Sequence, residues 1–154
     1  MIVGHGRHGK DTFADGFRER GWLCKDSSYA AAEIFLFEEL KGSMGYKTVD
    51  ECWDDRHSHR ALWFRMIAEY NHADNCRLMR SIYEHNDIYV GIRSQQELLA
   101  GLAQRLIDLV IWVERPGCKP EGGKSMNIRR SDSGIGVYND GSPESLRQKG
   151  RVLA

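Results

Sequence analysis

The stretch Gly4-His5-Gly6-Arg7-His8-Gly9-Lys10-Asp11-Thr12 predicts the fold of this 154-residue chain. It follows the apolar run 1–3 and precedes residues 13–17, which can be helical. A strand, a glycine-rich loop, a lysine and a helix form the context of a phosphate-binding P-loop, and the spacing fits its G-x-x-x-x-G-K core. Glycines let the main chain curl around one phosphate, and the helix N-terminus adds partial positive charge. The stretch therefore predicts a nucleoside triphosphate site.

Within this stretch, each residue type has an expected role toward ATP. Gly4, Gly6 and Gly9 shape the loop, and Lys10 can reach the β- and γ-phosphates. Asp11 occupies the position at which a Ser or Thr hydroxyl usually meets Mg²⁺, and Thr12 comes one residue later. A carboxylate can hold Mg²⁺ directly or through water. We expect Gly4, Gly6, Gly9, Lys10, Asp11 and Thr12 to bind ATP, with Asp11 as the metal ligand.

Two other interpretations of the loop remain open at this stage. The three glycines also spell G-x-G-x-x-G, the dinucleotide fingerprint, and Asp26 follows a possible second strand about where a ribose-binding acid would lie. This reading is less favoured because the dinucleotide motif does not require Lys10, whereas a P-loop does. The glycines can also form an incidental turn.

The composition predicts one globular domain over residues 1–154. Hydrophobic residues make up 41% of the chain, and 22 basic residues balance 22 acidic ones. A net charge of zero indicates neither a nucleic-acid-binding nor a membrane surface, so we expect small-molecule nucleotides as partners. The sequence shows no signal-peptide pattern and no C-x-x-C pair, which favours reduced thiols and a cytoplasmic location.

Hydrophobic periodicity predicts strands that alternate with helices. The expected strands are 1–3, 22–25, 88–92, 109–113 and 135–138. The expected helices are 10–20, 28–41, a short one capped by Thr48, 55–85 with a break at 71–74, 94–106 with a Ser94–Glu97 capping box, and a last one that begins at Asp140 or Ser142. This alternation indicates an α/β domain with a parallel sheet, whose ligands bind at the carboxyl ends of the strands.

Arginines are distributed as a phosphoryl-transfer site requires. Such a site holds two anions in line and neutralises their charge, and a planar guanidinium grips a phosphate with two N–H groups. Arg93 directly follows the third expected strand. The other candidates are Arg56, Arg60 and Arg65 in the middle helical segment, the first two on one helix face, and Arg115, Arg129 and Arg130 around the Pro/Gly-rich loop 115–130, an expected mobile lid.

With these residues, nearly the whole chain resembles the bacteriophage deoxynucleoside monophosphate kinases and their dephospho-CoA-kinase-like and adenylate-kinase-like relatives. Gly9-Lys10-Asp11-Thr12 is similar to the G-K-D-T form of their phosphate loop. Further similar segments are 27–35, Asp55-Arg56 with His59-Arg60, 69–71, 89–94 with its Gly91 and Arg93, 125–128 and 139–142.

The resemblance implies a fold, an activity and residue roles. The fold would be that of a P-loop nucleoside monophosphate kinase, a five-stranded parallel sheet flanked by helices, with a helical monophosphate-binding region at about 43–85 and a short lid at about 115–130. With ATP and Mg²⁺, the protein would phosphorylate a (deoxy)nucleoside monophosphate in the host cytoplasm, and the resemblance also suggests a homodimer. The implied roles are catalysis by Lys10, Arg93 and Arg130, acceptor binding by Ser28, Arg56, Arg60, Arg65, Arg93 and Arg129, and donor-base binding by Asn139 and Gly141.

One alternative to the kinase concerns catalysis alone. Many P-loop enzymes place an Asp that positions Mg²⁺ at the end of a neighbouring strand, and this chain has Gly91 there. Together with Asp11 after the lysine, Gly91 leaves open a nucleotide-binding protein without phosphoryl transfer.

Overall fold

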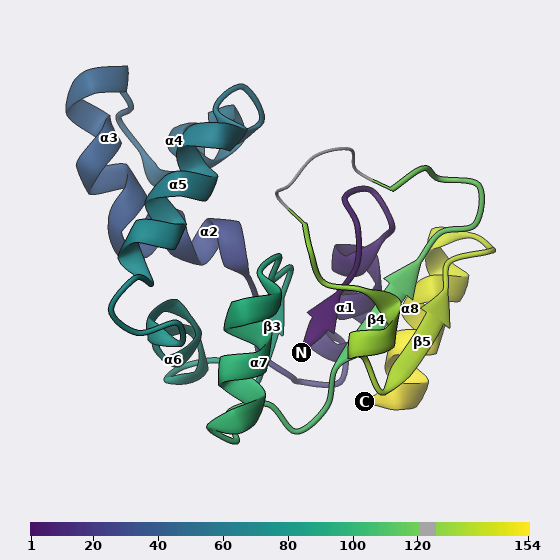
Figure 1. Ribbon diagram of the computed structural model, residues 1–154. Helices are drawn as coiled ribbons and strands as arrows, with labels where there is room; N and C mark the ends of the chain where they lie inside the picture. Colours follow the sequence, from purple (N-terminus) through teal and green to yellow (C-terminus); the bar gives the residue numbers. More distant parts are fainter. Residues whose placement is uncertain (121–125) are drawn as a thin grey trace.

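The computed structural model describes residues 1–120 and 126–154, and its centre is one parallel sheet (Figure 1). The strand order is β2-β3-β1-β4-β5, and every neighbouring pair is parallel. The bounds are β1 Ile2–Val3, β2 Cys24–Asp26, β3 Ile88–Val90, β4 Ile111–Glu114 and β5 Ile135–Tyr138. The predicted fold class, a five-stranded parallel sheet flanked by helices, is confirmed. Because β3 lies between β1 and β2, the order differs from the 3-2-1-4-5-6 order of dinucleotide-binding domains, which contradicts that alternative.

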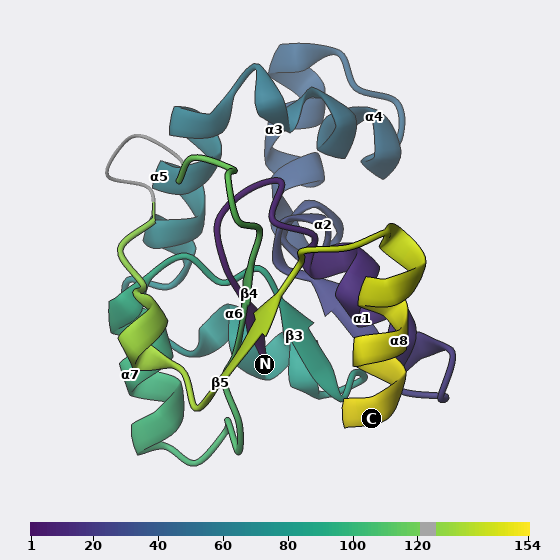
Figure 2. The same ribbon diagram turned by 90° about the vertical axis from the view of Figure 1, so that its right-hand side faces the viewer.

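One face of the sheet is covered by α1 (Lys10–Arg18) and α8 (Pro143–Leu153), which lie side by side (Figure 2). Two glycines permit this close packing. A Cβ added to Gly16 would lie 2.2 Å from the main-chain oxygen of Arg147, and one added to Gly150 would lie 2.3 Å from that of Phe13. Ser142 is the N-cap of α8, and its Oγ accepts the N–H of Ser145. This confirms the second of the two predicted starts.

The other helices lie toward the opposite face and beyond the carboxyl ends of the strands, where Figure 2 shows α3, α4 and α5 together. Their bounds are α2 Ser27–Ala31, a π-helical turn Ala32–Leu36, α3 Phe37–Met44, α4 Val49–Asp54, a 3-10 turn Asp55–His57, α5 Arg60–Tyr70, α6 Arg77–Tyr83 and α7 Gln95–Ala103. A second 3-10 turn spans Arg130–Asp132. The predicted cap at Thr48 and the break between two middle helices are confirmed.

Alternating side chains of β4 separate the core into two clusters. Ile111 and Val113 pack in the cluster that contains Phe13, Phe17 and Leu146, on the α1–α8 face. Trp112 packs in the larger cluster on the opposite face. Both clusters contain residues of the central strand β1, since Ile2 belongs to the first and Val3 to the second. The two clusters therefore hold β1 from both faces of the sheet, and this fixes the start of the loop that follows β1.

Three sequence-based expectations about helices need correction. The predicted end of the helix 28–41, before Gly42, is wrong, because α3 runs to Met44 and its C-cap is Gly45, which adopts φ 77°. The Ser94 hydroxyl does accept the N–H of Glu97 as the N-cap of α7. The second bond of the predicted capping box, from the Ser94 N–H to the Glu97 carboxyl, is wrong. The Glu97 carboxyl is buried and bonded to the hydroxyl of Tyr89. Arg56 and Arg60 do not share an α-helical face, because 55–57 form a 3-10 turn and α5 begins at Arg60.

The predicted lid at about 115–130 is described only at its two ends. Residues 121–125, which include Gly122, Gly123 and the first residue of the similar segment 125–128, lie outside the described residues. In the parts of the chain that are described, no helix is long and apolar enough to cross a membrane.

Candidate functional site at the phosphate loop

The loop between β1 and α1 curls through residues with left-handed backbone. Gly4 has φ 144°, Arg7 φ 66° and Gly9 φ 94°. Gly4 passes so close to β4 that an added Cβ would lie 2.3 Å from the main-chain oxygen of Val113. A Cβ at Gly9 would lie 2.6 Å from Asn139 Nδ2. Gly4 therefore requires glycine for space as well as for conformation, and Gly9 requires it for its positive φ.

Lys10 follows the loop directly and is the first residue of α1. No side chain caps this helix, whose N-cap is Gly9. The first N–H groups of a helix have no partner within it, and together with the helix dipole they attract anions. The Lys10 ammonium group donates a 2.9 Å hydrogen bond to the main-chain oxygen of His5. A cation and a helix N-terminus thus occupy one end of the loop.

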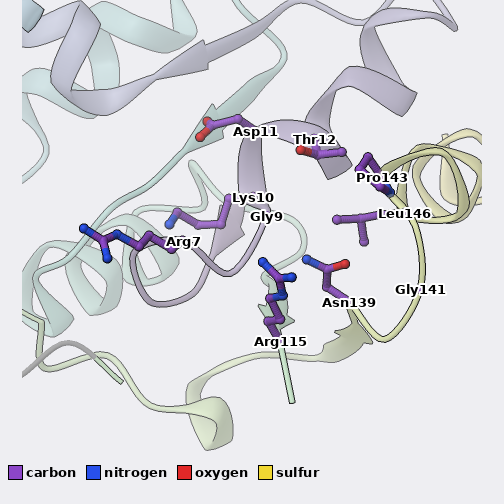
Figure 3. Close-up of a pocket in the computed structure, with 10 residues that line it drawn as sticks. All are labelled: Arg7, Gly9, Lys10, Asp11, Thr12, Arg115, Asn139, Gly141, Pro143 and Leu146. Atoms are coloured by element: carbon purple, nitrogen blue, oxygen red, sulfur yellow. The ribbon is translucent and has the colours of Figure 1, made fainter. Parts of the chain in front are cut away.

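A cavity of about 270 Å³ opens at this point (Figure 3). It is lined by Arg7, Gly9, Lys10, Asp11, Thr12, Arg115, Asn139, Gly141, Pro143 and Leu146. The structure therefore brings together six of the eight residues predicted to bind ATP. The other two, Gly4 and Gly6, belong to the loop without lining this cavity. Figure 3 shows Arg115 and Asn139 rising from the ends of β4 and β5 toward Gly9.

Two carboxylates lie near the lysine. Burial raises the pKa of Asp11, and the negative charge of Asp26 adds to this shift. Asp26 ends β2, and its Oδ1 accepts the N–H groups of Ser28 and Tyr29, each at 2.9 Å, as the N-cap of α2. A Cβ built on Gly91 would lie 3.5 Å from the other oxygen, Oδ2, and 3.9 Å from Lys10 Cε. Asp26 and Lys10 therefore approach each other across Gly91.

Sequence reasoning missed Asp26 as a residue of this site, because it considered Asp26 only as a ribose ligand. The missing signal was the strand order. Asp26 pairs with Val90 at the end of β3, directly before Gly91. β3 is followed by Gly91 and not by an acid, but Asp26 of the neighbouring strand lies beside it, and Gly91, at φ 95°, leaves space for this carboxyl group.

Two predicted acceptor residues lie beside Asp26. The guanidinium of Arg56 stacks on the Trp53 ring, 3.7 Å from its centroid, and donates a 2.8 Å hydrogen bond to the Trp53 main-chain oxygen. Burial lowers the pKa of Arg56, and the carboxylates of Asp26, Asp54 and Asp11 oppose this shift. The hydroxyl of Ser28 donates to Asp26 Oδ1 at 2.5 Å and accepts from Trp53 Nε1 at 3.0 Å. Ser28 therefore joins Asp26 to Trp53 and the arginine stacked on it.

The remaining two arginines of the helical region are less closely associated. Arg60 begins α5, and its guanidinium lies 3.3 Å from His57 Nδ1. Arg65 is exposed on the same helix. Residues five apart leave an α-helix about 140° from each other, so these two side chains do not face one ligand together. Neither residue lines the cavity at Lys10.

The predicted cations around the lid have different surroundings. Arg93 follows β3, and its main-chain oxygen accepts the N–H of Asn127 at 3.2 Å, which ties the end of the lid to this strand. Arg130 donates a 2.8 Å hydrogen bond to Ser133 Oγ, and its guanidinium covers Gly136 of β5. Arg129 is exposed. The structure thus places Arg130 against β5 rather than in the cavity of Lys10.

A second cavity, of about 620 Å³, lies between the phosphate loop, the end of β4 and the described ends of the lid. Arg115 lines both cavities. The other lining residues are His5, His8, Trp112, Glu114, Pro116, Gly117, Cys118, Pro120, Met126, Asn127, Ile128, Arg129 and Arg130. The site therefore has room for a second molecule next to the first.

Comparison with known proteins adds one similarity. No protein-family model matches this sequence. Among solved structures, the chain is similar to shikimate kinase from Aquifex aeolicus vf5, with 15% sequence identity and a TM-score of 0.48 over 99% of this chain and 94% of that chain. A similarity of this degree assigns neither a substrate nor an activity.

Proposed function

We propose that this protein is an ATP-dependent nucleoside monophosphate kinase, which transfers the γ-phosphoryl group of ATP to a (deoxy)nucleoside monophosphate. One observation carries the proposal: Lys10, at the uncapped start of α1, approaches Asp26 across Gly91, and the electrostatic influence of Asp26 reaches both Asp11 and Arg56. A lysine, two carboxylates and an arginine around a phosphate loop are the parts that phosphoryl transfer requires.

The donor occupies the smaller cavity in this proposal. Its phosphates lie in the curl of the loop against the N–H groups of α1 and the ammonium of Lys10. Its base lies between Arg115 and the segment from Asn139 to Pro143, which form the outer walls of that cavity. A guanidinium can stack on an aromatic ring, and an amide can bond its edge. The loop thus binds the reacting end of ATP, and the ends of β4 and β5 bind its base.

Asp11 and Asp26 fit a Mg²⁺ ion bound together with the phosphates. Mg²⁺ usually takes one or two carboxylates and completes its shell with phosphate oxygens and water. In residues 1–120 and 126–154, no group of three or more His, Cys, Asp or Glu side chains could hold a metal alone. Burial raises the pKa of Asp11, and the negative charge of Asp26 raises it further, so a bound cation would favour the ionised form of Asp11. When bound, the ion supplies charge neutralisation for the phosphates.

The acceptor occupies the larger cavity and extends toward Arg56 and Arg93. Its phosphate carries the attacking oxygen. That oxygen forms a bond to the γ-phosphorus, and the bond from this phosphorus to the β–γ bridging oxygen breaks, which leaves ADP. A phosphate monoester is already ionised near neutral pH, so no general base is needed. The arginines would hold the two anions together, and their distribution around the site supports this role.

One observation favours a second candidate, a nucleotide-binding protein without phosphoryl transfer. Arg130, the expected catalytic arginine of the lid, is held by Ser133 and by contact with β5. If this arginine does not enter the site, one stabiliser of the transition state is absent. Both arginines line the larger cavity, and Arg129 then has to provide the charge.

A coupled assay of ADP release tests the proposal. ATP and Mg²⁺ are offered with each common ribo- and deoxyribonucleoside monophosphate in turn. Release that depends on one or more monophosphates supports the kinase and names its acceptor. ATP binding without stimulation by any monophosphate supports the second candidate instead. A protein that fails to bind ATP contradicts both.

A further inference from the structure

His8 joins three segments at the donor cavity, although neither the P-loop pattern nor the proposed reaction requires a histidine there. Its side chain is almost fully buried, with 2% of the residue exposed. Nδ1 of its imidazole accepts the main-chain N–H of Arg115 at 3.1 Å, and its own main-chain oxygen accepts Asn139 Nδ2 at 3.1 Å. Arg115 follows β4 and Asn139 follows β5, so one loop residue holds both walls of the cavity.

The hydrogen bond to Arg115 defines the chemical form of His8. An imidazole nitrogen that accepts an N–H carries no proton, so the proton of the neutral ring is on Nε2. Burial lowers the pKa of His8, and His5 and Lys10 lower it further, while Glu114 and the main chain of Cys118 oppose the shift. The neutral ring is therefore the main form at neutral pH, and its unprotonated Nδ1 can accept the N–H of Arg115.

The position of Arg115 depends on its hydrogen bond to His8. It is exposed and precedes Pro116 at the start of the long segment after β4. Among the described residues, its guanidinium has no hydrogen bond or ion pair, so the position of the side chain depends on its main chain. That main chain is held by His8 at the N–H and by Cys118 N, which donates to the Arg115 oxygen at 3.1 Å. Only the first of these bonds connects Arg115 to the phosphate loop.

We propose that His8 is a positioning residue for the donor nucleotide: its imidazole fixes Arg115 at the wall of the donor cavity and thereby determines how tightly the donor base binds. The proposal rests on ATP as the donor of the proposed function. It does not require that phosphoryl transfer occurs, because it concerns the binding of ATP alone.

Two substitutions separate the hydrogen bond from the packing of the ring. Asn at position 8 can place Oδ1 where the imidazole has Nδ1, so His8→Asn keeps the acceptor, whereas His8→Ala removes it. Loss of one hydrogen bond of ordinary strength corresponds to about tenfold in a binding constant. We expect His8→Ala to weaken binding of a fluorescent ATP analogue with Mg²⁺ about tenfold, and His8→Asn to recover most of this loss. His85→Ala, at an exposed histidine after α6, is the matched control and should bind like the unchanged protein.

A double-mutant cycle with Arg115 tests the route of the effect. If His8 acts through Arg115, then His8→Ala should weaken binding little further in the background of Arg115→Ala. Multiplicative losses in the two variants would overturn the proposal. So would a His8→Asn variant that binds no better than His8→Ala, or a His8→Ala variant that unfolds at lower temperature yet binds ATP normally.

A spectroscopic measurement examines the same bond without any substitution. Nitrogen-15 chemical shifts of the His8 ring should show a proton on Nε2 and none on Nδ1 at neutral pH. A proton on Nδ1 would contradict the proposal. Because these measurements need no acceptor, absence of kinase activity would reject the proposed function while the His8 results still decide this inference.

Discussion

Lys10 donates a 2.9 Å hydrogen bond to the main-chain oxygen of His5, five residues earlier in its own loop. The bond holds the ammonium group across the curl that the phosphates are proposed to occupy. A side chain held in this way loses little conformational freedom when an anion binds, which favours electrostatic stabilisation of the transition state.

Substitution of Lys10 by alanine should therefore impair catalysis strongly. Removal of one preorganised stabiliser of transition-state charge lowers turnover by about 10²-fold or more. The measurement is the steady-state rate of ADP release with the preferred monophosphate. Lys41→Ala is the control, because Lys41 lies on α3 in an exposed ion pair with Glu38. Unchanged turnover in Lys10→Ala would remove Lys10 from the mechanism.

Asp26→Asn should separate the two tasks of this carboxyl group. Asn keeps Oδ1 as an acceptor for the N-cap of α2 but removes the negative charge. We expect turnover to fall at least about tenfold and more Mg²⁺ to be needed for half-maximal rate, with little change in melting temperature. Asp50→Asn, at an exposed position of α4, is the control. Normal Mg²⁺ dependence in Asp26→Asn would place the ion elsewhere.

The packing of α1 on α8 predicts opposite effects for two Gly→Ala substitutions. At Gly16 the new methyl group would collide with the main chain of α8, and overpacking of this kind costs about 1–3 kcal/mol. At Gly42, within α3, a Cβ meets nothing within 4 Å, so alanine should raise the free energy of unfolding by up to about 1 kcal/mol through helix propensity. Urea denaturation measures both. Equal effects would show that α1 and α8 do not pack as described.

The buried Glu97 predicts a pH dependence of stability. Burial raises its pKa from 4.5 to about 7, although the bond from Tyr89 opposes this shift. The folded state therefore keeps a proton that the unfolded state releases. This contribution to stability is complete below pH 4.5 and is lost as the pH rises to about 7, with a total on the order of 3 kcal/mol.

Urea denaturation across pH 4–8 measures this loss, with Glu97→Gln as the matched variant. Gln does not ionise, so only the unchanged protein should lose unfolding free energy through Glu97 between pH 4.5 and 7. Above about pH 7, the difference between the two proteins should stay constant. A difference that is independent of pH would show that Glu97 is ionised in the folded protein.

The sequence predicts those parts of this molecule that local chemistry decides. The loop from Gly4 to Lys10, the cap at Thr48 and the start of α8 at Ser142 depend on residues that are neighbours in the chain. Each motif specifies its own backbone geometry, so its structure could be expected without knowledge of the rest.

Features that depend on strand order or on distant contacts could not be predicted in the same way. Asp26 lies on the same side of Gly91 as Lys10 because β2 pairs with β3, and the sequence pattern does not specify this pairing. Glu97 matched a capping box, but burial beside Tyr89 decided its partner. Arg130 matched a catalytic arginine, and Ser133 together with the space over Gly136 decided its position.

Phosphorus-31 NMR directly observes the proposed transfer of a phosphoryl group between two nucleotides. ATP, Mg²⁺ and the preferred monophosphate are followed in one sample, with Lys10→Ala as the control. We predict that ATP and the monophosphate disappear together while two diphosphates appear in equal amounts, and that this exchange is largely lost in the variant. Inorganic phosphate as the product, or an unchanged spectrum despite bound ATP, would contradict the account.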